Sequence, residues 1–221
     1  VYAVALHDDL LVSGSHDKTA KLWSLSARAV TATLAEHTNA VYGVAVSDAA
    51  IATGSDDCTA RLWSREGGAS RHTLKHPSWV RGVAMAGDVL VTACFDKIVR
   101  TFSVASGQLT RELSGHTKIV GCVALSGSMV LSGDWDKTVK VWALTGEASA
   151  ECVATLEGHS EPVCGVVAGA GWVASQSAPS PNYPGAGELI VWRPLTAEDR
   201  AAIAAEKERL DALAEAARER A

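Results

Sequence analysis

The segment SGSHDKTAKLW at residues 13–23 recurs without gaps as TGSDDCTARLW at 53–63, TACFDKIVRTF at 92–102 and SGDWDKTVKVW at 132–142. Its aspartate falls at the same position in each copy: Asp17, Asp57, Asp96 and Asp136. The spacing between successive copies is nearly constant, and a fixed period of this length is typical of chains built from repeated supersecondary units. The repeat therefore predicts a fold built from several similar units.

Each copy predicts four short β-strands separated by turns. In the copy around Asp57, the stretch VYGVAVSDAAIATGS predicts two strands joined by a polar turn, and ARLW predicts a third. A weaker fourth run closes each complete copy, at 30–34, 71–74, 109–113 and 152–156. Four antiparallel strands in every copy predict an all-β fold, a β-propeller of four-stranded blades. About five blades are visible.

A histidine precedes each later copy and completes the pattern. These residues are His37, His76, His116 and His159, and the last two follow a glycine. With His, Ser/Thr, Asp and Trp in register, the sequence resembles the WD-repeat β-propeller family over about residues 1–193. It lacks the usual Trp-Asp dipeptide of that family, because Trp23, Trp63, Trp142 and Trp192 are not followed by Asp. The short turns between strands resemble those of F-box substrate receptors and of some signalling scaffolds.

The resemblance implies that the repeated polar residues of one blade form a hydrogen-bonded set. The residue types suit this role, since an indole N–H only donates, an ionised Asp only accepts, and Ser, Thr and His do both. In blade three Phe102 replaces the Trp and cannot donate, and blade five has no Asp in register. The implied members are Ser13, Asp17, Trp23, His37, Thr53, Asp57, Trp63, His76, Thr92, Asp96, His116, Ser132, Asp136, Trp142, His159, Ser175 and Trp192.

The same Ser, His and Asp residues suggest a competing interpretation, a propeller hydrolase with a catalytic triad. Repetition in every blade favours a scaffold, because catalysis needs one constellation. The sequence also contains no G-x-S-x-G elbow, H-E-x-x-H pair or P-loop. We therefore expect that the protein is not an enzyme, that it has no catalytic residue, and that it binds no cofactor. The histidines fall in different copies, far apart along the chain, which argues against a metal site.

Function is then expected at non-repeating residues that the fold presents to solvent. In the propellers that this sequence resembles, the residue before the turn Asp and the first residues of the innermost strand line the narrow face, where peptides bind. Trp, Tyr and Arg dominate such interfaces, because each buries a large area and keeps a polar group. The residues carried over are Tyr2, His16, Tyr42, Asp56, Trp79, Arg81, Phe95, Ile119, Trp135 and Cys164. Packing of Phe95 and Trp135 against neighbouring blades is the alternative.

An insertion at 177–187 lengthens the last copy by seven residues between Ser175 and Trp192. It is rich in Pro and Gly, and it is expected to emerge on the same face as the Asp turns. Tyr183 within it is either a further binding residue or an ordinary loop aromatic.

The expected domains are a propeller at 1–195 and a charged, Ala-rich helix at 196–221. The repeats run at about 1–36, 37–75, 76–115, 116–158 and 159–193. Four complete copies and one three-stranded copy do not make the common seven-bladed ring, so the chain is a fragment, a small ring or a ring completed by a second chain. We favour a fragment. The helix carries a narrow apolar stripe at coiled-coil-like spacing: Ile203, Leu210, Leu213 and Ala217.

Composition limits the possible partners. The 221 residues carry 20 Lys and Arg against 25 Asp and Glu, a net charge of -5, with no basic cluster. This balance argues against nucleic acid or an anionic membrane as the main partner. No secretory pattern or long apolar run appears, and the five cysteines form no Cys-x-x-Cys pair. We expect a cytoplasmic or nuclear protein-interaction scaffold, part of a larger complex, with a ubiquitin-ligase substrate receptor as the alternative.

Overall fold

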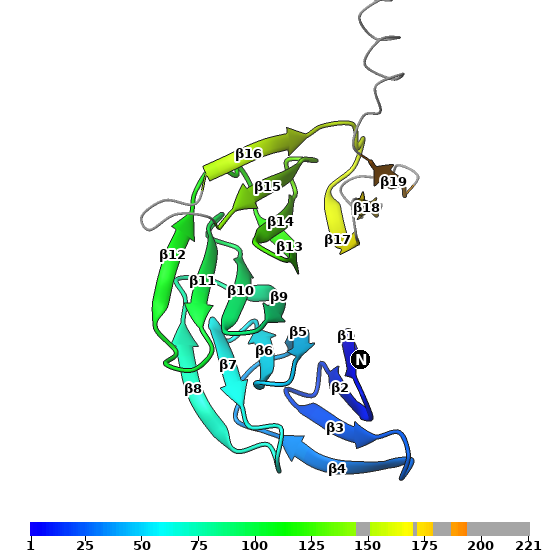
Figure 1. Cartoon of the computed structure of the whole chain (residues 1–221), viewed down its shortest axis with the longest axis vertical. Helices are drawn as coiled ribbons and strands as arrows, with labels where there is room; N and C mark the ends of the chain where they lie inside the picture. The colour runs from blue at the N-terminus through cyan, green and yellow to red at the C-terminus, as the bar shows by residue number, and fades with distance from the viewer. Residues whose placement is uncertain (145–150, 170–171, 179–186, 194–221) are drawn as a thin grey trace, which may run out of the picture.

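The computed structural model describes residues 1–144, 151–169, 172–178 and 187–193. Within these residues the chain forms five antiparallel sheets, four of four strands and one of three (Figure 1). The prediction of an all-β chain with four-stranded units is confirmed. The expected helix at 196–221 and Tyr183 lie outside the described residues. In the described part, no helix has the length and apolar character needed to cross a bilayer.

Each sheet is a simple meander in which neighbouring strands follow one another along the chain. The first sheet holds β1 (Ala3–His7), β2 (Leu10–Gly14), β3 (Ala20–Ser24) and β4 (Ala29–Leu34). The second holds β5 (Val41–Val46), β6 (Ile51–Ser55), β7 (Thr59–Trp63) and β8 (Ser70–Lys75). The third holds β9 (Val80–Ala86), β10 (Val89–Cys94), β11 (Val99–Ser103) and β12 (Leu109–Leu113). The fourth holds β13 (Val120–Ser126), β14 (Met129–Asp134), β15 (Val139–Ala143) and β16 (Glu151–Leu156), and the fifth β17 (Val163–Gly169), β18 (Trp172–Ser177) and β19 (Leu189–Trp192).

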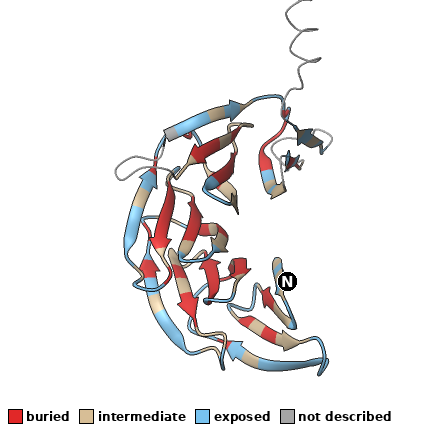
Figure 2. Ribbon diagram, viewed as in Figure 1, coloured by how far each residue is buried: buried red, intermediate tan, exposed pale blue. Residues whose placement is uncertain are grey.

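The five sheets follow one another along an open arc, and we call them blades one to five in chain order (Figure 1). The first strands of neighbouring blades, β1, β5, β9, β13 and β17, pack side by side along the inner edge of the arc. The fourth strands β4, β8, β12 and β16 run along the outside, where most residues are exposed (Figure 2).

The repeated Asp turn fixes the register between the second and third strand of a blade. Asp57 accepts hydrogen bonds from the backbone N–H and the hydroxyl of Thr59, at 2.9 and 2.6 Å. The residue between them, Cys58, has a φ of 65°. Asp is favoured in such turns because its carboxylate bonds to the backbone two residues on. The equivalent residues in three other blades, Lys18, Lys97 and Lys137, also have positive φ.

The apolar core lies between blades. One cluster joins Leu62 and Leu74 of blade two to Val80, Leu90 and Phe102 of blade three, and three similar clusters lie between the other neighbouring pairs. Each blade is therefore stabilised by burying apolar side chains against its neighbours.

Candidate functional site

The hydrogen-bonded set of blade two has every contact that the resemblance implies. His37 Nδ1 lies 2.7 Å from Asp57 Oδ2, and His37 Nε2 lies 2.7 Å from Thr53 Oγ1. The Trp63 indole donates to the same hydroxyl at 2.9 Å. Burial by itself raises the pKa of Asp57, but hydrogen bonds from His37 and Thr59 outweigh it and hold the pKa below its usual value. The carboxylate is thus ionised and fully engaged.

The other blades keep parts of this set. In blade one Trp23 donates to Ser13, in blade four Trp142 donates to Ser132, and in blade five Trp192 donates to Ser175, all at 2.8–2.9 Å. The histidine Nε2 atoms of blades four and five lie 2.6 Å from the same serine hydroxyls. The structure therefore brings these predicted residues together within each blade, fully buried in blade four and partly buried in blades one and five.

Blade three diverges further than the missing indole suggests. His76 Nε2 meets Thr92 at 2.9 Å, but its Nδ1 donates to the backbone oxygen of Leu74 at 3.0 Å. Asp96 pairs instead with the buried Arg100, at 2.7 Å. Burial lowers the pKa of His76 to about 4, so this ring is neutral at pH 7.

The acidic partner in blade five is Glu188, which sequence reasoning missed. Its Oε2 lies 3.4 Å from His159 Nδ1, and its carboxylate accepts from the N–H and the hydroxyl of Ser160, at 2.9 and 2.8 Å. The insertion shifts this residue to four positions before Trp192, where the other blades have six. A signal was present in the sequence, because Glu188 is the acidic residue directly before the last strand, just after the insertion.

A continuous row of aromatic side chains runs across one end of blades one to four. The Tyr2 and Tyr42 rings stack with centroids 4.2 Å apart, and His16 meets Tyr2 edge-on at 6.0 Å. On the next blades, Trp79 packs on Phe95 at 5.4 Å, and Phe95 packs on Trp135 at 6.1 Å. We call this surface the aromatic face; its members are Tyr2, Tyr42, Trp79, Arg81, Phe95 and Trp135.

Arg81 joins the two halves of the aromatic face. Its guanidinium carbon lies 4.0 Å from the centroid of Tyr42 and 4.9 Å from that of Phe95. The same guanidinium donates to both carboxylate oxygens of Asp56, at 3.2 and 3.1 Å. Such bidentate pairing and stacking hold the side chain rigidly. The positive charge is consequently neutralised by Asp56.

Backbone hydrogen bonds fix the position of the turns that carry these side chains. The N–H groups of Asp56, Phe95 and Trp135 donate to the carbonyls of Ala40, Trp79 and Ile119, at 3.1, 2.9 and 3.0 Å. The turn residue before the Asp is thereby tied to the loop that leads into the first strand. Ile119 thus positions Trp135 through its backbone.

A pocket of about 260 Å³ opens on the aromatic face beside Trp135. Its walls are Tyr42, Arg81, Phe95, Gly121, Trp135 and Cys164. In register, blades two and three carry Tyr42 and Arg81 where blade four carries Gly121, so a missing side chain creates the space. The residues expected on this face included Ile119 in blade four but not Gly121, which has no side chain. Burial raises the pKa of the Cys164 thiol, so it is protonated at pH 7.

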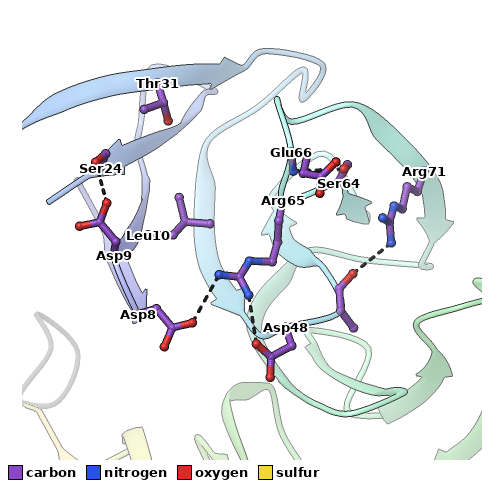
Figure 3. Close-up of a pocket in the computed structure, with 11 residues that line it drawn as sticks. Asp8, Asp9, Leu10, Ser24, Thr31, Asp48, Ser64, Arg65, Glu66 and Arg71 are labelled. Atoms are coloured by element: carbon purple, nitrogen blue, oxygen red, sulfur yellow. Dashed lines mark hydrogen bonds and ion pairs between the residues drawn. The ribbon is translucent and has the colours of Figure 1, made fainter. Parts of the chain in front are cut away.

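A second hollow lies at the opposite ends of the strands, between blades one and two. It has a volume of about 580 Å³ and is lined by Asp8, Asp9, Asp48, Arg65, Glu66 and Arg71 among others (Figure 3). Arg65 reaches across it to Asp8 at 3.7 Å and to Asp48 at 3.2 Å.

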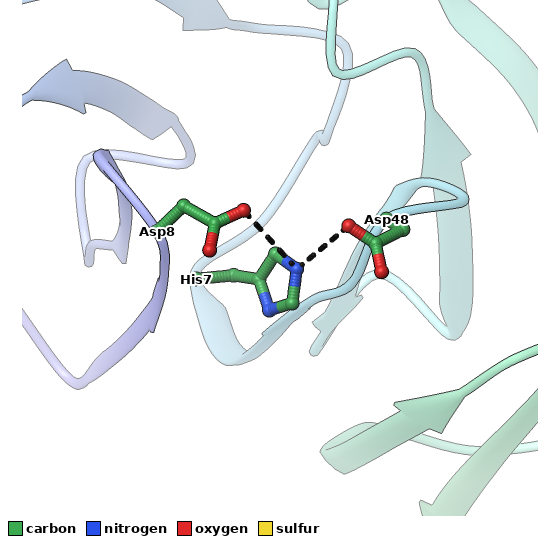
Figure 4. Close-up of side chains that lie close together, drawn as sticks. All are labelled: His7, Asp8 and Asp48. Carbon is green, nitrogen blue, oxygen red and sulfur yellow. Dashed lines mark hydrogen bonds and ion pairs between the residues drawn. The ribbon is translucent and has the colours of Figure 1, made fainter.

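His7 stands beside this hollow with the same two aspartates (Figure 4). Its Nε2 lies 2.9 Å from Asp48 Oδ1 and 3.5 Å from Asp8 Oδ2. The two carboxylates are well exposed and also pair with Arg65, so water and this arginine already compensate their charge.

Five meander sheets that pack side by side through their first strands are arranged as the blades of a β-propeller are. Three segments, at residues 1–24, 28–64 and 107–143, match the family model described as WD domain, G-beta repeat. These three segments are therefore WD repeats, as the sequence pattern predicted, and propellers built from such repeats generally serve as protein-interaction scaffolds. The matched segments leave out most of blade three, where Phe102 replaces the Trp.

One similar solved structure is the crystal structure of the computationally designed Ika8 protein. It superimposes with a TM-score of 0.74 at 26% sequence identity, over 87% of this chain. The match spans 58% of the designed protein's chain. Among curated proteins, no sequence matches this chain.

Proposed function

We propose that the aromatic face binds a peptide segment of a partner protein, and that the chain acts as a non-catalytic scaffold. One observation carries this proposal: an ordered row of aromatic rings, tied together by Arg81, borders a preformed pocket. Rigid aromatic surface binds at a low cost in side-chain entropy. Trp79 and Tyr2 remain 43% and 51% exposed, so much of their surface is available to a partner.

The charge of the aromatic face favours an apolar or aromatic peptide over a phosphorylated one. Phosphate recognition relies on arginine guanidinium groups that can donate to the ligand. Arg81 already donates two hydrogen bonds to Asp56 and has aromatic rings on its faces. A phosphopeptide would have to displace Asp56, which makes a phosphate-reading substrate receptor the poorer fit.

The buried sets support a scaffold over a hydrolase. Ser132 is fully buried, and its hydroxyl lies between His116 Nε2 and the indole of Trp142. A nucleophile needs an open path to its substrate and a hydroxyl aimed at it. Ser132, Thr53 and Ser175 instead serve as acceptors for the indole N–H groups of their own blades.

The test is a selection of peptides from a random display library on the immobilised chain, followed by affinity measurements with the Trp79→Ala and Trp135→Ala variants. We expect each variant to lose at least about tenfold in affinity, as interface tryptophans commonly do. The melting temperature of the variants should stay close to that of the wild type. Unchanged affinity, or a fall in stability that accounts for the loss, would show that these side chains serve packing alone.

A further inference from the structure

Blade four differs from the others at the last residue of its second strand. Asp134 pairs with Val120 across the sheet, as Ser55 pairs with Val41, Cys94 with Val80 and Ser177 with Val163. Among the described residues at this register position, Asp134 is the one carboxylate. Its side chain is fully buried.

This extra carboxylate faces a histidine and a second aspartate. Asp134 Oδ2 lies 3.1 Å from His116 Nδ1, and Asp136 Oδ2 lies 3.8 Å from the same nitrogen. The three atoms all lie within 4.8 Å of one another. Ligands bound tetrahedrally to one ion at about 2.0–2.2 Å lie about 3.3 Å apart, so small shifts would place these three around a common centre.

His116 presents a nitrogen that lacks a hydrogen bond. Its side chain is fully buried, and Nδ1 points toward both carboxylates without meeting hydrogen-bond geometry. In blade two the equivalent nitrogen of His37 bonds directly to Asp57 at 2.7 Å. His116 Nε2 lies 2.6 Å from the Ser132 hydroxyl. When Nε2–H donates to that oxygen, Nδ1 offers a lone pair, the arrangement in which histidine binds metals.

The charge of the cluster calls for a cation. Asp134 accepts hydrogen bonds from the backbone N–H groups of Lys118 and Asp136, at 3.0 and 3.1 Å. Asp136 likewise accepts hydrogen bonds from the N–H groups and hydroxyls of Thr117 and Thr138. All these bonds solvate the carboxylates but supply no positive charge. Two neighbouring carboxylates are costly in a buried site unless a positive charge compensates them.

We propose that His116, Asp134 and Asp136 bind one divalent transition-metal ion of the zinc class. One imidazole and two carboxylates suit Zn²⁺, whereas Ca²⁺ and Mg²⁺ prefer all-oxygen sites. The Asp136 side chain is 12% exposed and gives the ion a route from solvent. Because Trp135 lies between the two aspartates, the ion holds the turn that presents Trp135 on the aromatic face. The proposal stands independently of what that face binds.

The interpretation of the sequence expected no metal site, because it compared the histidines only with one another. The distance between histidines of different blades does not bear on whether residues of one blade can bind a metal together. Asp134 is two residues from Asp136 and faces the histidine of the same blade only after the strands have paired.

The test uses the whole chain, stripped with a chelator and kept reduced with a phosphine. Titration with Zn²⁺ in a calorimeter should show one bound equivalent, and Zn²⁺ should raise the melting temperature. Asp134→Ser places the residue of blades two and five, Ser55 and Ser177, at this position, so the variant is expected to fold. It should lose more than about 100-fold in zinc affinity, since even residues that only support a ligand cost 10–100-fold.

Three further measurements make the result specific. Co²⁺ substituted for Zn²⁺ should give the absorption of a tetrahedral site with nitrogen and oxygen ligands. The absence of a thiolate band would exclude the cysteines as ligands, and this measurement needs no variant. The His7→Asn variant should bind zinc like the wild type, which excludes the exposed cluster of Figure 4. The Ser55→Asp variant should gain a second site beside His37 and Asp57. No zinc uptake by the wild type, or equal uptake by Asp134→Ser, would overturn the proposal.

Discussion

Asp57 shows how one repeated residue serves a blade. Its carboxylate accepts from His37 Nδ1, from the N–H of Thr38, and from both the N–H and the hydroxyl of Thr59. Asp17 occupies the same position in blade one but is exposed, and its own turn supplies its shortest bonds, from Thr19. The same residue type at the same register therefore carries different energetic weight.

Replacing Asp57 should destabilise the protein far more than replacing Asp17. Asp57→Ala leaves a buried imidazole N–H and several turn donors without an acceptor, which costs about 2–4 kcal/mol. Asp17→Ala loses a solvent-exposed turn contact and should cost about 1 kcal/mol or less. Urea denaturation of both variants measures the difference. Equal costs would mean that the His37–Asp57 contact contributes nothing beyond the turn.

His76 should make stability depend on pH. Its pKa falls from 6.5 to about 4 because the ring is buried. Between these two pH values the unfolded chain takes up a proton and the folded chain does not. The contribution of His76 to the unfolding free energy is therefore complete above pH 6.5. This contribution, about 3 kcal/mol in all, is lost as the pH falls to about 4. His76→Gln cannot take up this proton, so its unfolding free energy should fall less between pH 6.5 and 4. Parallel pH profiles for the variant and the wild type would contradict this.

At the scale of elements, the first strands pack so closely that side chains must be absent at particular positions. A Cβ at Gly43 of β5 would lie 2.6 Å from the backbone oxygen of Arg81 in β9. A Cβ at Gly121 of β13 would meet nothing nearer than 3.6 Å, at Trp135 Nε1. One glycine thus permits contact between blades, and the other leaves a pocket.

Alanine at these two glycines should have opposite consequences. Gly43→Ala forces two backbones apart and should cost about 1–3 kcal/mol of unfolding free energy. Gly121→Ala makes ordinary contacts and should change stability by less than about 1 kcal/mol, in either direction. Calorimetric melting of the two variants tests this pair. Similar melting temperatures would show that blades two and three are not packed as described.

The elements were predictable from the sequence because their signals are local and repeated. The alternation around 41–55 and the turn at Asp57 lie within one copy, and four copies agree. Glu188, Gly121 and the pairing of Asp96 with Arg100 were not foreseen. Each depends on an insertion, a register shift or a substitution that matters only after strands have paired. The aromatic face was predicted only in part. Its residues followed from their positions in the repeat, but the stacking of Arg81 on Tyr42 depends on contact between two blades.

In the whole molecule, the described arc ends in two apolar surfaces, which we call its outer faces: one on β1 and one on β19. Val4 and Leu6 of β1 are 63% and 57% exposed, and Leu189 and Val191 of β19 are 72% and 62% exposed. Ala3 and Ala5, which alternate with the first pair, pack on the core between blades one and two. Faces of this kind cover neighbouring blades elsewhere in the arc.

This 221-residue polypeptide should self-associate through these outer faces. Exposed apolar patches promote association, because water is released when they are covered. Light scattering should give a mass that rises with concentration above that of one chain. Replacing Val4 and Leu6 with Lys should lower that mass without changing the β-sheet circular dichroism. A single-chain mass at every concentration would show that other contacts cover these faces.

If the aromatic face binds a peptide, the pocket beside Trp135 should receive one of its side chains. The most direct measurement compares the affinity of a display-selected peptide for the wild type and for the Gly121→Leu variant. Gly121 lines the pocket, and a Cβ there would meet nothing nearer than 3.6 Å, so leucine is expected to fill part of the pocket. We predict at least a tenfold loss of affinity with unchanged unfolding free energy, roughly 1.4 kcal/mol or more of binding. An affinity equal to that of the wild type, in a variant that folds normally, would contradict the account.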